Sequence, residues 1–143
     1  MIATPLATIH NAPMLLINKD NIPIQIKNEI IKINPKKIIL IGKDHTIPQK
    51  VVDEIKSIIL NIKIDRIGEN SIYETSYIID QKIHDENNIE EIYIGNVYDE
   101  DDLLSIAPVA GNKKQPIVIT QEDKLDEKMC TWLSDKNIKN VYF

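Results

Sequence analysis

The chain is poor in cysteine, glycine and aromatic residues: it has one cysteine, four glycines and 5% aromatic side chains. Its single cysteine, Cys130, excludes a disulfide within the chain and gives no information on the compartment. Cys130 lies at helical spacing in the run DEKMCTWL, which predicts a half-buried structural thiol rather than a nucleophile. A chain of 143 residues is long enough to bury a hydrophobic core without cross-links or metals, so we expect one domain of that kind.

Long apolar runs are also absent, since none approaches the roughly 18 residues of a membrane-spanning helix. The N-terminus shows neither the cationic region nor the cleavage site of a secretory signal peptide. Positive charge is in deficit as well, because 17 lysine and arginine residues face 22 aspartate and glutamate residues, for a net charge of −5. Nucleic-acid binding needs a basic footprint. We therefore expect no membrane span and no nucleic-acid partner, while a local basic patch remains compatible with this charge.

What the chain does contain is a regular alternation of short apolar runs and helical patterns. Apolar residues recur at helical spacing in segments that begin near residues 22, 52, 72 and 125. Pro23 and Pro48 lie where a first helical turn accepts proline, and Asn34-Pro35 marks a helix end. The Ile- and Val-rich runs between the helices are typical of strands buried on both faces: PMLLIN (13–18), KIILIG (37–42), IKIDRI (62–67), EIYIG (91–95), PIVIT (116–120) and NVYF (140–143). Strands that alternate with helices in this way predict an α/β fold with a mainly parallel sheet and flanking helices.

The chain also repeats part of itself. A shift of 103 residues, from 1 to 104, places Met1–Leu40 on Leu104–Phe143 without a gap. Apolar positions coincide under this shift, for example Leu16 with Ile119. Identical residues coincide at Pro5/Pro108, Ala7/Ala110, Pro13/Pro116, Asp20/Asp123, Asn34/Asn137 and Lys36/Lys139. Paired prolines at matching points before a strand favour common descent, so the chain holds about one and two-fifths periods of a repeat.

Motifs of known enzymes and metal sites are missing. The sequence has no GxGxxG, GxxxxGK[ST], GxSxG or HExxH pattern, and none of its histidines has a metal-ligand neighbour at a useful spacing. His84 and Asp80 are predicted to form a solvated surface pair. The acidic residues 99–102 suit Ca²⁺ or Mg²⁺, but they lack the EF-hand register, and the first turn of a helix favours the same carboxylates. We therefore favour a helix cap there and expect no catalytic site, no metal and no cofactor.

Two basic pairs lie beside predicted strand starts, Lys36-Lys37 and Lys113-Lys114. A solvated face is the ordinary role of such pairs, but ammonium groups are also adaptable contacts for phosphate or carboxylate. The segment IGKDHTIP (41–48), which contains Lys43, leads from a strand into a helix. Carboxyl ends of parallel strands and helix N-termini attract anions. These five lysines are therefore candidates for contact with an anionic ligand.

Three blocks of the sequence carry a resemblance to a known family. RIGENSIYETS (66–76), DLLSIAPVAGNKKQPIVIT (102–120) and KKIILIGKDHTIPQKVVDEI (36–55) resemble the cell wall binding repeat 2 module of clostridial surface proteins. The N-terminal ATPLATIHNAPMLLINKD (3–20) matches the middle block a second time. The resemblance implies Rossmann-like units built from βα repeats, which occur in tandem and are not catalytic. It also implies that the units hold surface proteins, S-layer proteins among them, to the wall of Gram-positive bacteria by binding an anionic secondary wall polymer non-covalently.

The resemblance also nominates site residues and shows where this copy departs from the family pattern. The polymer-binding candidates that it adds to the lysines are Arg66, Tyr73, Glu74 and Thr75. The family's glycine falls on Glu69, its Asp-Arg pair falls on Ser71 and Ile72, and the second glycine of its I-G-G falls on Lys43. If the missing arginine normally contacts polymer or a neighbouring module, this copy is a degenerate binder. Tyr73 and Thr75 could equally cap and pack the third helix.

In the family's frame a module begins near Asp65. Residues 1–64 then resemble the C-terminal part of one module, and residues 65–143 resemble the N-terminal part of the next. No glycine- or serine-rich linker separates them, so we expect them to pack as one compact unit. Whether the chain is a fragment or a natural small protein stays open.

Three functions remain as hypotheses. The first is a non-catalytic module that anchors a protein at the cell surface by binding an anionic wall polymer. The second is a structural module that packs against sister repeats or forms a homo-oligomer without touching polymer. The third is a small nucleotide-binding protein or enzyme on a Rossmann-like scaffold, which only the analogy of fold supports.

Overall fold

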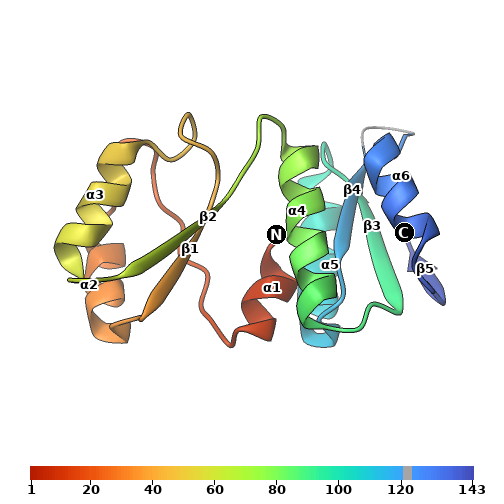
Figure 1. Cartoon of the computed structure of the whole chain (residues 1–143), viewed down its shortest axis with the longest axis horizontal. Helices are drawn as coiled ribbons and strands as arrows, with labels where there is room; N and C mark the ends of the chain where they lie inside the picture. The colour runs from red at the N-terminus through yellow and green to blue at the C-terminus, as the bar shows by residue number, and fades with distance from the viewer. Residues whose placement is uncertain (121–123) are drawn as a thin grey trace. The chain divides into compact units, whose positions relative to one another are not determined.

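The computed structural model describes residues 1–120 and 124–143 of the chain (Figure 1). These residues form two compact units, of which unit 1 is Met1–Met14 with Ile72–Phe143, and unit 2 is Leu15–Ser71. The first residues of the chain therefore belong to the same unit as its second half. The division into modules at residues 64 and 65, and the packing of the chain as one compact unit, stay predictions.

Unit 2 consists of α2 (Ile24–Ile33), β1 (Lys37–Ile41), α3 (Gln49–Ile58) and β2 (Lys63–Ile67). β1 and β2 pair in parallel, with a register that runs from Lys37 opposite Lys63 to Ile41 opposite Ile67. Isoleucine and valine side chains of both helices and both strands fill its core. α2 ends at Asn34, whose left-handed backbone (φ 47°) closes the helix before Pro35. The predicted helix end at this dipeptide is confirmed.

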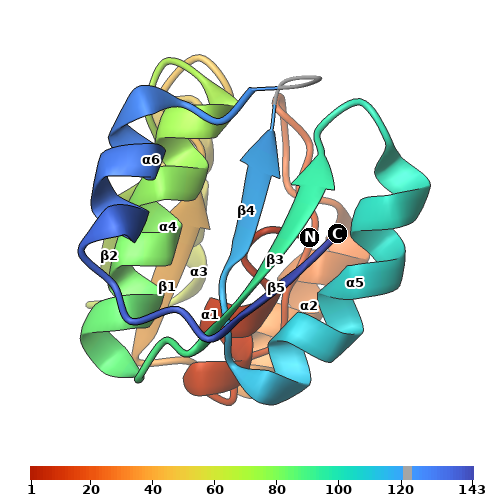
Figure 2. The ribbon, with the colours of Figure 1, turned by 90° about the vertical axis from the view of Figure 1, so that its right-hand side faces the viewer.

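Unit 1 contains a three-stranded parallel sheet in the order β4-β3-β5. Its elements are α1 (Thr4–Ile9), α4 (Ile72–Glu86), β3 (Glu91–Asn96), α5 (Glu100–Lys113), β4 (Ile117–Thr120), α6 (Glu127–Ser134) and β5 (Asn140–Tyr142). α4 and α6 lie on one side of this sheet and α5 lies on the other (Figure 2). Each face of the sheet therefore has its own apolar cluster, with Tyr93 on the α5 side and Ile92 on the α6 side.

The predicted α/β class with parallel strands and flanking helices is confirmed, with the strands divided between two small sheets. One predicted strand is wrong. Residues 13–18 form no strand, because no described strand lies beside them to accept and donate main-chain hydrogen bonds. The run is apolar enough for a strand, but a strand also needs a neighbour.

The repeat seen in the sequence recurs in the structure. α2 begins at residue 24 and α6 at residue 127, while β1 begins at 37 and β5 at 140, each pair 103 residues apart. Asn11 and Lys114, also 103 residues apart, both adopt left-handed backbone conformations, with φ of 49° and 57°. Lys114 is the C-cap of α5 and Asn11 directly follows the C-cap of α1, so the left-handed residue lies at the equivalent point after each helix.

Two side-chain predictions are wrong. Cys130 is exposed rather than half-buried. Asp80 is completely buried, so Asp80 and His84 do not form a solvated pair. Among residues 1–120 and 124–143, no helix is long and apolar enough to cross a membrane. The same residues hold no group of three or more His, Cys, Asp or Glu side chains that could bind a metal ion.

The buried Asp80 should make the stability of unit 1 depend on pH. Its Oδ2 accepts a 3.5 Å hydrogen bond from Ser76 Oγ, and its Oδ1 has no partner among the described residues. Burial raises the pKa of Asp80 well above 3.8, and the Ser76 hydrogen bond opposes this effect only in part. Because the pKa is higher in the folded state, the folded protein retains the proton that the unfolded chain loses. The contribution of Asp80 to stability is therefore complete below about pH 3.8 and is lost as the pH rises through the folded pKa.

Replacing Asp80 by asparagine removes this titration while keeping the shape of the side chain. We expect Asp80→Asn to melt about 4 °C or more above the wild type at pH 8 and close to it at pH 4. Thermal unfolding followed by the fluorescence of Trp132, which lies in the same unit, measures the difference. Asp85→Asn is the matched control, because Asp85 is an exposed carboxylate on the same helix. A constant difference between Asp80→Asn and wild type across this pH range would contradict the argument.

Candidate functional site

The predicted polymer-binding residues are divided between the two units. Lys36, Lys37, Lys43 and Arg66 lie in unit 2, and Tyr73, Glu74, Thr75, Lys113 and Lys114 lie in unit 1. Within unit 2 they occupy opposite ends of the sheet. Lys36 and Lys37 lie at the N-terminal end of β1, whereas Lys43 follows the C-terminal end of β1 and Arg66 lies near the C-terminal end of β2.

The start of the unit 2 sheet carries a concentration of positive charge. Lys37 Nζ lies 2.7 Å from Asp65 Oδ2, and Lys63 Nζ lies 3.9 Å from Asp65 Oδ1. The backbone N–H of Lys63 also donates a 3.3 Å hydrogen bond to the carbonyl of Lys36. Two lysine ammonium groups therefore share one carboxylate, Lys36 directly precedes Lys37 in the chain, and all three lysines are exposed. We call Lys36, Lys37 and Lys63 the basic edge.

Lys63 is a residue that sequence reasoning missed. It begins the next predicted strand, and the starts of neighbouring parallel strands lie side by side, as the register of Lys37 opposite Lys63 shows. That signal was present in the sequence, but using it required knowing that the first and second strands of the unit are neighbours.

The opposite end of unit 2 uses its cations to hold a loop in place. Arg66 Nη1 donates to the carbonyls of Gly42 and Ile47 at 2.7 and 2.9 Å, which ties the segment after β1 to β2. Its Nη2 lies 3.5 Å from Asp44 Oδ1. Lys43 Nζ donates to Asn70 Oδ1 at 2.9 Å and lies 3.5 Å from Glu69 Oε2. Both side chains are therefore engaged within unit 2, and their part in polymer binding stays a prediction.

Tyr73, Glu74 and Thr75 form the first turn of α4 in unit 1. Thr75 is 8% exposed, and Tyr73 packs against the apolar cluster on the α5 side of the sheet. Glu74 lies 3.9 Å from the ammonium of Lys128 at the start of α6. The burial of Thr75 and the packing of Tyr73 favour the packing role that the sequence left open, whereas the side chain of Glu74 is 40% exposed.

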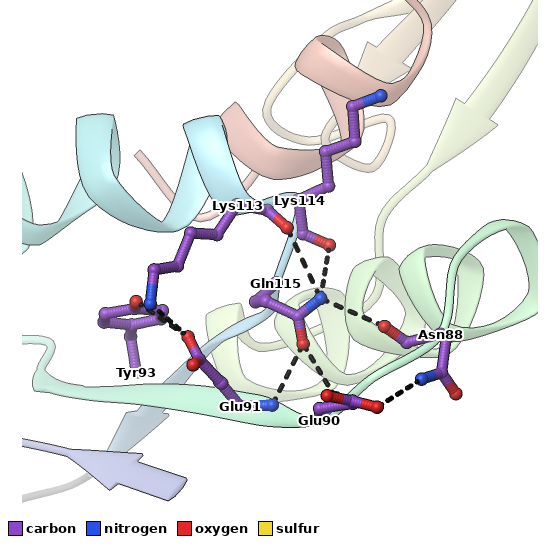
Figure 3. A network of polar contacts seen from close by, with 7 residues as sticks. All are labelled: Asn88, Glu90, Glu91, Tyr93, Lys113, Lys114 and Gln115. Atoms are coloured by element: carbon purple, nitrogen blue, oxygen red, sulfur yellow. Dashed lines mark hydrogen bonds and ion pairs between the residues drawn. The ribbon is translucent and has the colours of Figure 1, made fainter.

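Lys113 belongs to a polar network at the end of α5 (Figure 3). Its Nζ lies 2.7 Å from Glu91 Oε2 and 5.5 Å from the centre of the Tyr142 ring. The hydrogen bond to Glu91 raises the pKa of Lys113, and the same contact lowers the pKa of Glu91. A pocket of about 280 Å³ beside the network is lined by Glu90 and Glu91 as well as Lys113, so it offers an anion little net attraction.

Lys114 differs from its neighbour. It ends α5 in a left-handed conformation, and its ammonium points away from the network of Figure 3. In the part of the chain that the structure describes, neither Lys114 nor Lys36 forms an ion pair within the protein. These two ammonium groups are therefore the candidates with the least internal competition for an anion.

The acidic residues 99–102 begin α5. Asp99 accepts a 3.2 Å hydrogen bond from the backbone N–H of Asp102, and the next three residues supply carboxylates to the first turn. The cap interpretation is confirmed. Negative charge at this helix start also disfavours a phosphate there, where a nucleotide-binding fold would need one.

Comparison with known proteins agrees with the fold and with the repeat. The chain is 39% identical to Cwp6 from Clostridium difficile, with a TM-score of 0.93 over 99% of this chain and 22% of that one. It is 26% identical to Cwp8 from the same organism, with a TM-score of 0.82 over 97% of this chain and 24% of that one.

Two Bacillus subtilis (strain 168) proteins are also similar. N-acetylmuramoyl-L-alanine amidase LytC is 25% identical over 139 residues, which are 97% of this chain and 27% of the relative. The amidase enhancer is 31% identical over 123 residues, which are 86% of this chain and 17% of the relative. The chain therefore spans about a quarter or less of the length of these relatives.

The profile of one family, Cell wall binding domain 2 (CWB2), matches residues 66–143. This match covers the predicted motif block that begins at Arg66 and the middle block that ends at Thr120. The resemblance inferred from those blocks is confirmed. The chain belongs to the cell wall binding domain 2 family and is a cell-wall binding module.

Proposed function

We propose that this module is a non-catalytic anchor, which holds a surface protein to the wall of a Gram-positive bacterium by binding an anionic secondary wall polymer non-covalently. Membership of the family supports binding to the wall. We assign the amidase and amidase-enhancing roles in the names of two relatives to the rest of those proteins, since the chain spans 27% and 17% of them. We assign this chain the binding role alone.

The observation that carries the proposal is the basic edge of unit 2. Three exposed lysines lie together there, two of which share the carboxylate of Asp65, in a protein whose net charge is −5. A linear polyanion gains most from closely spaced cations, because each charged group along the polymer can meet one ammonium. Lys114, which forms no ion pair among the described residues, offers a further ammonium in unit 1. The internal contacts of Arg66, Lys43 and Lys113, like the pairs of Lys37 and Lys63 with Asp65, compete with polymer.

Neutralising part of the basic edge should weaken wall binding. We expect Lys37→Gln/Lys63→Gln to bind isolated walls about fivefold or more weakly, since two exposed ion pairs contribute on the order of 0.5–1 kcal/mol each. Co-sedimentation with walls over a range of protein concentrations measures the effect, and raised salt should reduce wild-type binding further.

The matched control is Lys19→Gln/Lys50→Gln, which removes the same charge from exposed lysines of unit 2 outside the basic edge. Walls stripped of their acid-extractable polymer serve as the second control and should bind poorly. Equal binding to stripped and intact walls, or equal losses in the two double variants, would overturn the proposal.

A nucleotide-binding or enzymatic role gains no support from the site. The start of α5 carries four acidic residues, 99–102, and the sequence has no phosphate-binding loop.

A further inference from the structure

We propose that Asp65 is an internal competitor at the basic edge. Its carboxylate occupies the place where an anionic group of the ligand binds, and it thereby sets how many anionic groups a ligand needs in order to bind. This role rests on the proposed function, in which the basic edge is the polymer site. It goes beyond that function because it assigns a residue of negative charge a part in the specificity of the site.

Strand geometry brings Asp65 within reach of two lysines. Lys37 lies opposite Lys63 in the register of β1 and β2, and Asp65 follows Lys63 by two residues on the same strand. Side chains two residues apart in a strand point to the same face of the sheet. Ile38 and Ile64, which alternate with these positions, pack against the hydrophobic cluster of unit 2. Lys37, Lys63 and Asp65 therefore share the other face of the sheet.

The contacts of Asp65 are those that a bound anion would make. Its Oδ2 lies 2.7 Å from Lys37 Nζ, and its Oδ1 lies 3.9 Å from Lys63 Nζ. A carboxylate or phosphate group of a ligand has the same charge-assisted contacts available to it. The side chains of Lys37 and Asp65 are 42% and 36% exposed, so a ligand in solution reaches both. An anionic group in this place therefore competes directly with Asp65.

This competition makes the number of anionic groups decisive. A ligand with one such group exchanges the contacts of Asp65 for equivalent contacts of its own and gains no ion pair. A linear polyanion places a second group on a neighbouring ammonium, and Lys36, which directly precedes Lys37, forms no ion pair among the described residues. Only the polyanion adds ion pairs to those that the protein already has. Asp65 thus lowers the affinity for every anion but leaves polyanions able to bind.

A purely structural role for Asp65 predicts a different result. Like charges directly opposite each other on paired strands are destabilising, and the carboxylate reduces this repulsion between Lys37 and Lys63. If that were its whole role, removal of the carboxylate would loosen unit 2 and leave anion binding the same or weaker. Competition predicts the opposite sign, because the loss of the carboxylate releases two ammonium groups.

Asp65→Asn in the full chain tests the proposal, since it removes the charge and keeps the size of the side chain. We expect this variant to bind isolated walls about threefold more tightly than wild type, because weak exposed ion pairs no longer compete. Asp20→Asn is the matched control, since Asp20 pairs with Lys50 at 2.8 Å in an exposed part of unit 2 outside the basic edge. It changes the net charge equally and should bind within about 1.5-fold of wild type.

Two-dimensional NMR with defined anions measures the same competition without walls. Inorganic phosphate is the probe with one anionic group, and long-chain inorganic polyphosphate is the probe with many. We expect polyphosphate to shift the amide signals of Lys36, Lys37 and Lys63 in both proteins, at about threefold lower concentration in Asp65→Asn. Millimolar phosphate should shift these signals in Asp65→Asn and leave those of wild type unchanged.

The gain in affinity must also depend on the lysines. In a Lys37→Gln/Lys63→Gln background, Asp65→Asn should change binding no more than Asp20→Asn does, because no pair remains to be released. Equal wall binding by Asp65→Asn and Asp20→Asn, or a gain that persists without the two lysines, would overturn the proposal. Phosphate shifts of the same size in wild type and Asp65→Asn would also overturn it.

The two kinds of probe separate the role of Asp65 from the anchoring function. If wild type binds walls and Asp65→Asn binds them no better, the role of Asp65 is wrong and the anchoring function stands on its own test. If wild type binds polyphosphate at the basic edge but does not bind walls, the anchoring function is wrong. The NMR comparison of wild type with Asp65→Asn then decides the role of Asp65 by itself.

Discussion

Replacement of Gly68 by alanine is expected to lower the free energy of unfolding of unit 2 by about 3 kcal/mol, near the upper end for an overpacked site. A Cβ atom at this position would lie 2.5 Å from the carbonyl carbon of Gly42 and 2.5 Å from the nitrogen of Lys43. Both are backbone atoms, so no rotation of a side chain can relieve the contact. The ends of β1 and β2 would have to separate.

The surroundings of Gly68 make that separation costly. The backbone N–H of Gly42 donates a 2.7 Å hydrogen bond to the carbonyl of Ile67, and Arg66 Nη1 donates to the carbonyl of Gly42 at 2.7 Å. Moving the segment after β1 would lengthen both bonds. Gly68 therefore permits the close approach on which the loop that carries Lys43 depends.

Amide hydrogen exchange measures the effect, in β1 and β2 for Gly68→Ala and in β3 for its control, because the single tryptophan lies in unit 1 and does not report on unit 2. Gly95→Ala is the matched control. Its Cβ would lie 2.6 Å from Leu103 Cδ2, the end of a flexible side chain, so we expect a cost of only about 1 kcal/mol. Equal costs for the two variants would show that the backbone contact at Gly68 is not the determining feature.

The fold could be predicted from the sequence where local pattern and tertiary structure agree. Five of the predicted strand runs overlap β1 to β5, and the helices begin close to the residues that Pro23, Pro48 and the apolar spacing indicated. The run at 13–18 was predicted wrongly because its apolar pattern matches β4, whereas pairing depends on a neighbour that no local pattern reveals.

The candidate site was predictable as a set of residues but not as an arrangement. The pairs Lys37–Asp65, Lys43–Glu69 and Lys113–Glu91 join residues that are more than 20 positions apart. Strand register decides the first of these pairs, and loop geometry decides the second. Which lysines remain available to an anion therefore follows from tertiary structure alone.

Asp80 illustrates the same limit. A helical spacing of four residues to His84 suggested a surface pair, but that spacing is identical on the buried and exposed faces of α4. Burial of Ile79 and Ile83 on either side of Asp80 shows which face this is. For Leu16 the mistake was the opposite one. Its equivalent in β4, Ile119, is buried, so a core position was expected, but the Leu16 side chain is 87% exposed.

Replacement of Gln115 by leucine is expected to destabilise unit 1 by about 3 kcal/mol. Gln115 is 7% exposed, and its amide joins two segments that are more than 20 residues apart (Figure 3). Its Oε1 accepts from the backbone N–H groups of Glu90 and Glu91 at 2.8 and 3.0 Å. Its Nε2 donates to the carbonyl of Asn88 at 3.0 Å. Leucine fills a similar volume but can neither accept nor donate.

The cost arises from the groups left behind. Two backbone N–H groups and one carbonyl would lose their partner, and each such group costs about 1–3 kcal/mol where water cannot replace it. The carbonyl of Glu90 also accepts the backbone N–H of Lys139 at 2.8 Å, so a shift of this segment would loosen the attachment of β5 to β3. Urea unfolding followed by Trp132 fluorescence measures the loss, and exchange of the β5 amides should rise with it.

Asn87→Ala provides the matched control, because Asn87 Nδ2 donates to the neighbouring Lys114 carbonyl at 2.7 Å from an exposed position. Water can replace that bond, so we expect a loss of about 0.5 kcal/mol or less. Gln115→Glu should fall between the two, since a carboxylate still accepts from both N–H groups but cannot donate to Asn88. Near wild-type stability of Gln115→Leu would contradict this prediction. It would mean that water replaces the lost hydrogen bonds at the start of β3, and that strand pairing rather than the Gln115 amide holds β5.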